Sequence, residues 1–410
     1  MRREMGRRGR VPQIAAQTEH RTLSMSHPSR RSEVEPFLAM DVLSRANTLE
    51  AEGRHILHME VGQPGAAAPA PVLAAARAAL EGGRIGYTEA RGLASLRQAI
   101  AGYYRDTHGL DVPLSRIVAT TGSSAGFNLA FLAAFDVGDR VAITAPGYPA
   151  YRNILKALGL VPVEIEVGAD TRWALTPELL EAAHREGPLK GVLVASPANP
   201  TGTMMTPQAL KALSDACEAL DIRFISDEIY HGLVFDGEQE TALSFTDKAI
   251  VINSFSKYYC MTGWRIGWMV LPEDLVRPVE RIAQSLYISP PELSQRAAAA
   301  AFDARDELEA VKAGYARNRA LLLERMPQLG FTELLPVDGA FYLYAGIRPF
   351  ANDSLAFASR LLEEAGIAAT PGPDFDPVNG RSYMRFSFAG DHAVITEAVE
   401  RLADWLSRAG

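Results

Sequence analysis

Lys257 lies among residues that are able to hold an anion. It belongs to the stretch "INSFSKYYCMTGWR", in which Ser254 and Ser256 precede the lysine and Arg265 ends the stretch. A neutral lysine amine can form a Schiff base with an aldehyde, while serine hydroxyls and a planar arginine fork suit a phosphate. The alternative is a surface turn with two solvated cations, and the rest of the chain must decide between the two interpretations.

Polar residues also follow several other apolar runs. "TGSSAG" follows "RIVAT", "PANPTG" follows "GVLVAS", and "DEIY" follows "RFIS". Ligands of open parallel sheets bind beyond the carboxyl ends of the strands, so these residues would converge with those around Lys257. Because Asn, Asp and Ser are also common turn residues, each motif taken alone is better explained as a turn or a helix cap.

Short apolar runs alternate with helical stretches between "RIVATTG" and "WRIGWMVLP". This alternation predicts an α/β fold, with a mostly parallel sheet that is flanked by helices. The nearly continuous apolar run "GVLVA" indicates a strand that is buried on both faces. After about Pro290 a long helical region, 291–326, leads into further strands and a last helix. We therefore expect a second, smaller α+β domain, which the helical pattern near 36–52 completes.

The chain divides into four expected parts. They are a disordered basic leader at 1–34, an N-terminal segment of the small domain at 35–60, a large ligand-binding domain at 61–290 and the C-terminal small domain at 291–410. The leader is rich in arginine and has no apolar stretch long enough for a signal peptide. One hypothesis is that the natural protein starts at Met25.

Composition excludes several classes of function. The 410 residues are 48% hydrophobic and 22% charged, which is enough apolar material for a large core. The net charge of −8 argues against a nucleic-acid partner or an anionic membrane as partner. Only Cys217 and Cys260 are present, so we expect neither disulfides nor a zinc cluster and favour a cytoplasmic location. The eight histidines show no ligand spacing, and no metal site is predicted.

Taken together, four motifs resemble one enzyme family. "NPTG", "DEIY", "SFSK…GWRIGW" and "RFSF" occur in this order, and the chain from about residue 35 to its end is similar to the class I and II aminotransferases of fold type I. The resemblance implies the cofactor pyridoxal 5′-phosphate. It also implies a ping-pong reaction, in which an L-amino acid leaves its amino group on the cofactor and a 2-oxo acid then takes it.

The resemblance implies the catalytic residues. Lys257 would carry the cofactor as a Schiff base and then move a proton as general acid and base. Asp227 would pair with the pyridine nitrogen, which keeps the ring able to accept electrons. Tyr230 and Asn199 would donate hydrogen bonds to the phenolic oxygen. Glu228 follows Asp227 on an extended strand and would point the other way, so it receives no role.

The resemblance also implies how the rest of the cofactor is held. A helix N-terminus at "TGSSAG" would offer backbone N–H groups to the phosphate. The expected phosphate-binding residues are Gly122, Ser123, Ser124, Ser254, Ser256 and Arg265. Tyr148 would stack on the ring, and Tyr151 is expected in the core or at the rim. Tyr87 would reach the phosphate of a neighbouring subunit, which implies a homodimer with shared active sites; the alternative for Tyr87 is a buried aromatic residue at a helix entry.

Arg385 in "SYMRFSF" matches the position that grips the substrate α-carboxylate, with the Gly62 backbone and Asn199 close to it. Arg381 is expected on the surface. The stretch "SLYISPPELSQR" offers no cation for a second carboxylate, and Arg296 within it is expected to face elsewhere. We therefore favour a neutral or aromatic L-amino acid with 2-oxoglutarate as acceptor.

Other functions stay open on these residues. Aspartate is an alternative donor, because other loops can supply the second cation. The same constellation serves a C–S β-lyase, a decarboxylase or an aminocyclopropane-forming enzyme, because the cofactor accepts the electrons in each reaction. A non-catalytic, cofactor-binding regulator of this family would need a DNA-binding helix-turn-helix, for which residues 1–35 are too short.

Overall fold

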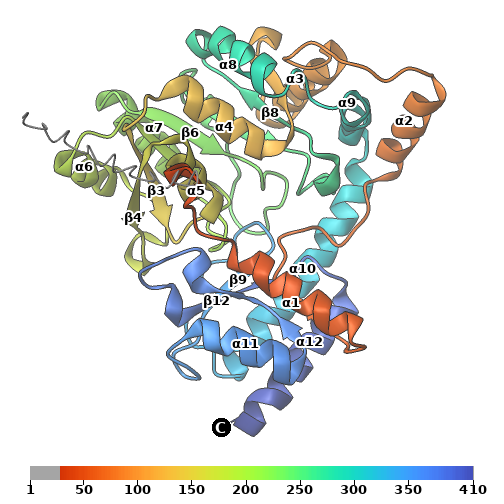
Figure 1. Ribbon diagram of the computed structural model, residues 1–410, viewed down its shortest axis with the longest axis vertical. Coiled ribbons are helices and arrows are strands. Elements are labelled where there is room, and N and C mark those ends of the chain that lie inside the picture. The colour runs from red at the N-terminus through yellow and green to blue at the C-terminus, as the bar shows by residue number, and fades with distance from the viewer. Residues whose placement is uncertain (1–27, 410) are drawn as a thin grey trace, which may run out of the picture.

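A large sheet lies between two layers of helices in the upper part of the molecule (Figure 1). The computed structural model describes residues 28–409, so most of the expected basic leader lies outside the described residues. The seven strands follow the order β2-β8-β7-β6-β5-β3-β4. Their bounds are β2 Ile117–Thr120, β3 Arg140–Ala145, β4 Val161–Glu166, β5 Gly191–Ala195, β6 Arg223–Asp227, β7 Ile250–Ser254 and β8 Gly267–Val270.

The pairing of these strands confirms the mostly parallel sheet. Strand β8 runs antiparallel to both of its neighbours, and the pairs β3–β4, β3–β5, β5–β6 and β6–β7 are parallel. The carboxyl ends of β5, β6 and β7 therefore lie at one edge of the sheet, where the polar motifs follow them.

Helices bury both faces of the large sheet. Alternate strand residues point to opposite faces, so Leu193 packs with α4 (Gly122–Ala134), α5 (Pro149–Leu158) and α8 (Glu273–Leu286). Its neighbours Val192 and Val194 pack on the other face. That face is covered by α2 (Ala70–Glu81), α3 (Ala94–His108), α6 (Pro177–Glu186), α7 (Pro207–Ala219) and α9 (Glu292–Ala299). The apolar run "GVLVA" is thus buried on both sides, as its pattern predicts.

Both ends of the chain build the lower part of the molecule (Figure 1). An antiparallel sheet has the order β11-β12-β9, and β1 near the N-terminus pairs in parallel with β10. The strands are β1 Leu57–His58, β9 Tyr342–Gly346, β10 Ile367–Ala368, β11 Thr370–Pro371 and β12 Tyr383–Ser387. The helices are α1 Leu38–Ala51, α10 Arg305–Gln328, α11 Ser354–Ala365 and α12 His392–Ala409. This arrangement supports our proposal that 35–60 and most of 291–410 form one small domain, but α9 at the start of that range packs on the large sheet.

A partly buried ion pair fixes the strand that joins the two chain ends. His58 Nδ1 lies 2.7 Å from Glu60 Oε1, and His58 Nε2 lies 3.3 Å from Glu50 Oε1. The hydrogen bond to the buried Glu60 carboxylate raises the pKa of His58 from 6.5 to about 9. The stabilisation is therefore fully present below pH 6.5 and is lost as the pH rises through about 9.

We predict that His58→Gln lowers the free energy of unfolding at pH 7 by about 1–2 kcal/mol, a figure reduced for solvent screening. The difference should disappear at pH 10, where the wild-type imidazole is also neutral. Urea unfolding at both pH values measures it, with His55→Gln as control because the His55 side chain is 66% exposed. An equal difference at pH 7 and pH 10 would contradict the assignment.

Candidate active site

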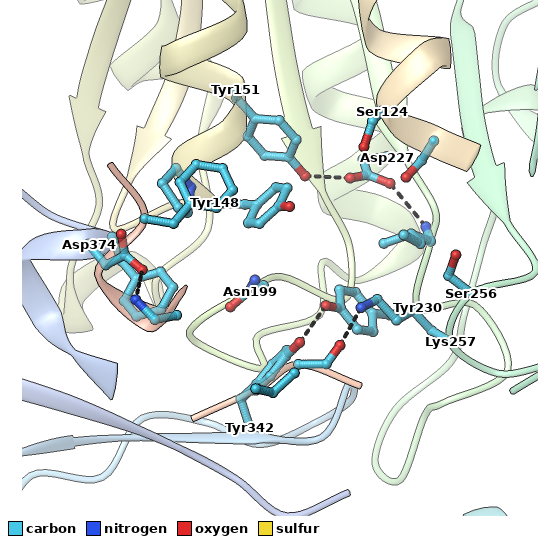
Figure 2. A pocket seen from close by; sticks show the side chains of 18 of the residues that line it. Ser124, Tyr148, Tyr151, Asn199, Asp227, Tyr230, Ser256, Lys257, Tyr342 and Asp374 are labelled. Carbon is cyan, nitrogen blue, oxygen red and sulfur yellow. Dashed lines mark hydrogen bonds between the residues drawn. The ribbon is translucent and has the colours of Figure 1, made fainter. Parts of the chain in front are cut away.

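One cavity of about 240 Å³ lies between the carboxyl edge of the large sheet and the small sheet. Asn199 follows β5, Asp227 ends β6 and Lys257 follows β7, while Arg385 reaches the cavity from β12. Figure 2 shows Asn199, Asp227, Tyr230 and Lys257 around this space. The residues that the separate motifs contribute therefore meet in one place.

Most of the expected site residues line this cavity. They are Gly62, Ser123, Ser124, Tyr148, Asn199, Asp227, Tyr230, Ser256, Lys257, Arg265 and Arg385. Gly122 and Ser254 are not part of the lining, but Gly122 lies against Arg265 and the Ser254 hydroxyl bonds Ser256 Oγ. Tyr87 does not belong to the cavity of its own subunit, because its side chain is 82% exposed.

The Lys257 amine occupies the centre of the cavity. Its Nζ donates a hydrogen bond to the Gly62 carbonyl oxygen and lies 5.8 Å from the ring centres of Tyr230 and Phe341. Desolvation and the positive charges of Arg385 and Arg265 together lower the pKa of Lys257 from 10.5 to about 8, although the carboxylate of Asp227 opposes the fall. A larger fraction of this amine is thus neutral and nucleophilic near pH 7 than in a solvated lysine.

Asp227, the last residue of β6, places a buried carboxylate in the same cavity as Lys257. Its Oδ1 accepts a hydrogen bond of 3.1 Å from the Ile229 N–H, and its Oδ2 accepts one from the Tyr151 hydroxyl. Burial raises the pKa of Asp227 to about 6, although both hydrogen bonds oppose the rise. The group is therefore mostly ionised at pH 7 and can pair with a protonated ring nitrogen.

Glu228 turns away from the cavity, as the alternation along the strand predicts. Its carboxyl group accepts hydrogen bonds from the Thr241 hydroxyl at 2.9 Å, the Ala242 N–H at 3.0 Å and the Ser226 hydroxyl at 3.1 Å. These contacts hold the segment after β6 and give Glu228 no access to a ligand in the cavity.

A pair of tyrosine hydroxyls stands beside Lys257. Tyr230 Oη and Tyr342 Oη are 2.8 Å apart, and the Tyr342 ring lies under the Arg385 guanidinium at 4.4 Å. The hydroxyl of Tyr342 also explains the glycine at position 62, because a Cβ there would overlap it. Tyr342 was not expected from the sequence, although "GAFYLY" alternates as a strand should and places Tyr342 and Tyr344 on one face.

Hydrogen-bond donors and a guanidinium gather at one end of the cavity. Helix α4 begins at Gly122, whose φ of +73° suits glycine, and a Cβ there would overlap the Arg265 guanidinium. The Ser254 hydroxyl donates to Ser256 Oγ at 3.0 Å. No carboxylate of the described residues lies within ion-pair distance of Arg265. A helix N-terminus, serine hydroxyls and an unpaired guanidinium fit a phosphate group.

Arg385 is a buried cation without an anionic partner. Its side chain is held between the rings of Tyr342 and Phe375, at 4.4 and 4.7 Å. It donates to Asn199 Oδ1 at 3.0 Å and to the Glu60 carbonyl oxygen. The residue is only 4% exposed, its Nε has no partner, and none of the described carboxylates pairs with it. An anionic ligand would compensate this charge.

The two other arginines lie on the surface, as expected. Arg381 pairs with Asp353 at 2.9 Å, and its side chain is largely exposed. Arg296 pairs with Glu292 on its own helix and does not line the cavity.

The start of α1 forms an apolar wall of the cavity. Asp374, far along the chain, accepts hydrogen bonds from the Leu38 N–H at 3.0 Å and the Ala39 N–H at 3.2 Å. This carboxylate therefore caps a helix that has no side-chain cap of its own. Phe37 and Met40 on this segment face the cavity. The N-terminal wall could not be assigned from the sequence, because its anchor is remote.

Tyr151 is buried in the core, as expected. The sequence did not predict that it also lines the cavity and that its hydroxyl donates to Asp227 (Figure 2). The alternative interpretation of Tyr87 as a buried aromatic residue is wrong, since its ring is exposed.

We predict that Asp374→Ala loosens the start of α1 and lowers the free energy of unfolding by about 1 kcal/mol, the usual value of a lost helix cap. Trypsin should then cleave faster after Arg45. The matched control is Asp353→Ala, which removes the cap of α11, where Asp353 accepts from the Leu355 N–H at 3.0 Å. Equal cleavage after Arg45 in both variants would rule out a specific anchor.

Comparison with known proteins gives consistent matches along most of the chain. Residues 54–402 match the family model "Aminotransferase class I and II". The chain is 49% identical over 380 residues to a valine–pyruvate aminotransferase of Mycobacterium tuberculosis, covering 92% of this chain and 97% of that protein. It is 32% identical to an arginine–pyruvate transaminase of Pseudomonas aeruginosa, covering 89% and 93%.

Solved structures agree with these matches. A crystal structure of an aminotransferase from Mycobacterium tuberculosis superposes with a TM-score of 0.92 at 48% identity, covering 94% of this chain and 100% of that one. An aspartate aminotransferase of Thermus thermophilus with maleate gives a TM-score of 0.87 at 32% identity, covering 93% and 100%.

Proposed function

The chain belongs to the class I and II aminotransferases, a pyridoxal-phosphate-dependent family, and on this premise we propose that it moves the amino group of an apolar L-amino acid to a small 2-oxo acid. The observation that carries the proposal is the buried, unpaired Arg385 guanidinium in the same cavity as the Lys257 amine. Arg385 would bind the α-carboxylate of the amino acid, and its planar fork would orient the Cα–H bond.

The charges of the cavity support a neutral substrate side chain. Its lining cations in one protomer are Lys257, Arg265 and Arg385. Lys257 is the reacting amine, Arg265 would hold the phosphate and Arg385 the α-carboxylate. None of these described cations remains for a second carboxylate. The remaining wall includes the apolar residues Phe37, Met40, Val61, Ile229 and Phe375.

The residues present fit the cofactor. When bound, pyridoxal phosphate supplies an aldehyde and a protonated ring that accepts electrons. We propose that Asp227 holds the ring nitrogen, that Asn199 and Tyr230 hold the phenolic oxygen and that Tyr148 covers the ring. The phosphate would be held by Gly122, Ser123, Ser124, Ser254, Ser256 and Arg265.

The chain's own groups then divide the work of the reaction. With a pKa of about 8, the Lys257 amine can take a proton from the substrate Cα and return one, since its neutral and charged forms are both accessible near pH 7. Asn199 accepts from Arg385 and thereby connects the carboxylate end of the cavity to the ring end.

Valine and pyruvate are the first pair to test. A relative that is 49% identical bears the name valine–pyruvate aminotransferase, and an apolar wall suits a branched aliphatic side chain. Pyruvate also fits better than the 2-oxoglutarate expected from the sequence, because 2-oxoglutarate carries a second carboxylate for which no lining cation is left in one protomer. A relative that is named aspartate aminotransferase is more distant, at 30% identity.

We also propose a homodimer with shared sites. Large apolar side chains are exposed on two neighbouring segments of the chain. One segment carries Ile85 and Tyr87, and the other carries Leu286 and Ile288. The two segments are joined by hydrogen bonds from the Gly86 N–H to Glu292 and from the Thr88 N–H to Ser289. An exposed apolar patch of this kind marks an interface, from which Tyr87 would reach the phosphate site of the second copy.

We predict that valine converts the enzyme-bound cofactor at least about tenfold faster than aspartate, which corresponds to one unpaired charge of about 1.4 kcal/mol or more. Single half-reactions with valine, phenylalanine and aspartate, followed by the cofactor's absorbance, measure the rates. Lys257→Ala should abolish them, and Arg385→Lys should lower kcat/KM about 100-fold. A faster reaction with aspartate would refute the neutral substrate, and pyruvate, ammonia and a thiol released from an S-alkylcysteine without an acceptor would indicate a C–S β-lyase.

A hybrid experiment tests the shared site. Lys257→Ala and Tyr87→Ala are each expected to be weak or inactive alone, the first for want of the amine and the second through weaker cofactor binding. After mixing and exchange of subunits, a hybrid dimer would contain one site with an intact Lys257 and an intact Tyr87. Activity should therefore return on mixing; no recovery in exchanged dimers would place Tyr87 outside the partner's site.

A further inference from the structure

Tyr151 is held in one orientation beside Asp227. It lies in the first turn of α5, one helical turn after Tyr148, so both rings point toward the cavity. Its ring packs edge-on against Phe127 at 5.1 Å and against Tyr148 at 5.4 Å. The residue is 5% exposed. The packing leaves the hydroxyl directed at Asp227 Oδ2, to which it donates a hydrogen bond (Figure 2).

Few groups act on the Asp227 carboxylate. The Ile229 N–H bonds Oδ1 at 3.1 Å, Tyr151 bonds Oδ2, and Lys257 is the nearby cation. Tyr148, at the N-cap of α5, and Glu228, directly after β6, are the other titratable groups near it. Tyr151 is thus the one side chain among the described residues that donates a hydrogen bond to this carboxylate.

From this geometry we propose that Tyr151 is a positioning residue, which orients Asp227 and keeps its carboxylate ionised for the ring nitrogen of the cofactor. The inference rests on the cofactor site proposed above. It extends that site by a residue that does not itself contact the reacting atoms.

A tyrosine is well suited to this role because it does not titrate in the working range. Burial raises the pKa of Tyr151 well above 10, so the hydroxyl keeps its proton and always donates. Its hydrogen bond lowers the pKa of Asp227, which burial has raised to about 6. Without the hydroxyl, that pKa would move upward toward neutrality, and a protonated Asp227 would no longer form an ion pair with the ring.

The test is Tyr151→Phe in the full-length protein, read by the dissociation constant of pyridoxal phosphate. We expect Kd to rise about tenfold at pH 5, where a rise of one pKa unit on Asp227 lowers its ionised fraction by about that factor. The ratio of variant to wild-type Kd should fall toward one as the pH is raised to 9, because Asp227 then ionises in both proteins. A ratio that does not depend on pH would contradict the proposal.

A second ligand distinguishes an effect of Tyr151 on the Asp227 carboxylate from a general loss of packing around the ligand. The probe is the analogue of pyridoxal phosphate in which C–H replaces the ring nitrogen, since it cannot form an ion pair with Asp227. Tyr151→Phe should change the Kd of this analogue less than about twofold. Equal weakening of both ligands would overturn the proposal and leave Tyr151 with a packing role.

Two control variants complete the experiment. In an Asp227→Asn background, adding Tyr151→Phe should change the Kd of pyridoxal phosphate less than about twofold, because the carboxylate on which Tyr151 acts is gone. Tyr104→Phe removes another buried hydroxyl, which accepts from Trp268 at 3.1 Å far from the cavity, and should leave Kd unchanged. A full effect of Tyr151→Phe on Asp227→Asn would refute the proposal, whereas a wild type that does not bind pyridoxal phosphate would refute the cofactor site.

Discussion

The fold buries a guanidinium in the candidate active site without pairing it with any carboxylate of the described residues. Arg385 is buried without a carboxylate partner, Arg265 stands at the opposite end, and the Lys257 amine lies between them. Removing the Arg385 guanidinium from water costs several kcal/mol while it stays unpaired, whereas Arg265 is exposed. Favourable interactions elsewhere in the folded chain must offset this cost. An anionic ligand that binds only the folded chain reduces the cost and so stabilises the fold. The unpaired charge of Arg385 therefore destabilises the ligand-free fold and, for the same reason, favours the binding of an anion.

Strand geometry separates two carboxylates that are adjacent in sequence. Asp227 ends β6 and Glu228 directly follows it, yet only Asp227 faces the cavity. Glu228 faces the other side, where Ser226, Thr241 and Ala242 satisfy it. Burial raises the pKa of both carboxyl groups. The two groups contact different neighbours, however, and therefore have different roles. One carboxylate is presented to a ligand, and the other holds the backbone segment that carries Tyr230.

The sequence predicted the residues whose signals are local. Lys257, Asp227 and Asn199 each follow an apolar strand within a recognisable motif, so strand order alone brings them together, and the mostly parallel sheet followed from the same alternation. Tyr151 and Tyr342 could not be assigned in this way. Their partners lie 76 and 112 positions away, and helical or strand periodicity tells which face a side chain occupies but not which polar atom its hydroxyl meets. The antiparallel direction of β8 was likewise invisible, because a short apolar run carries no sign of its direction.

The contact between Asp374 and the first turn of α1 spans 336 positions and has a consequence for biosynthesis. A nascent chain that has emerged only as far as α10 already contains Lys257 and Asp227, but it lacks both Arg385 and the anchor of the N-terminal wall. Its amine would face an open, water-filled surface during translation. The cavity is complete only after the last quarter of the polypeptide has left the ribosome and Asp374 has bonded the first turn of α1.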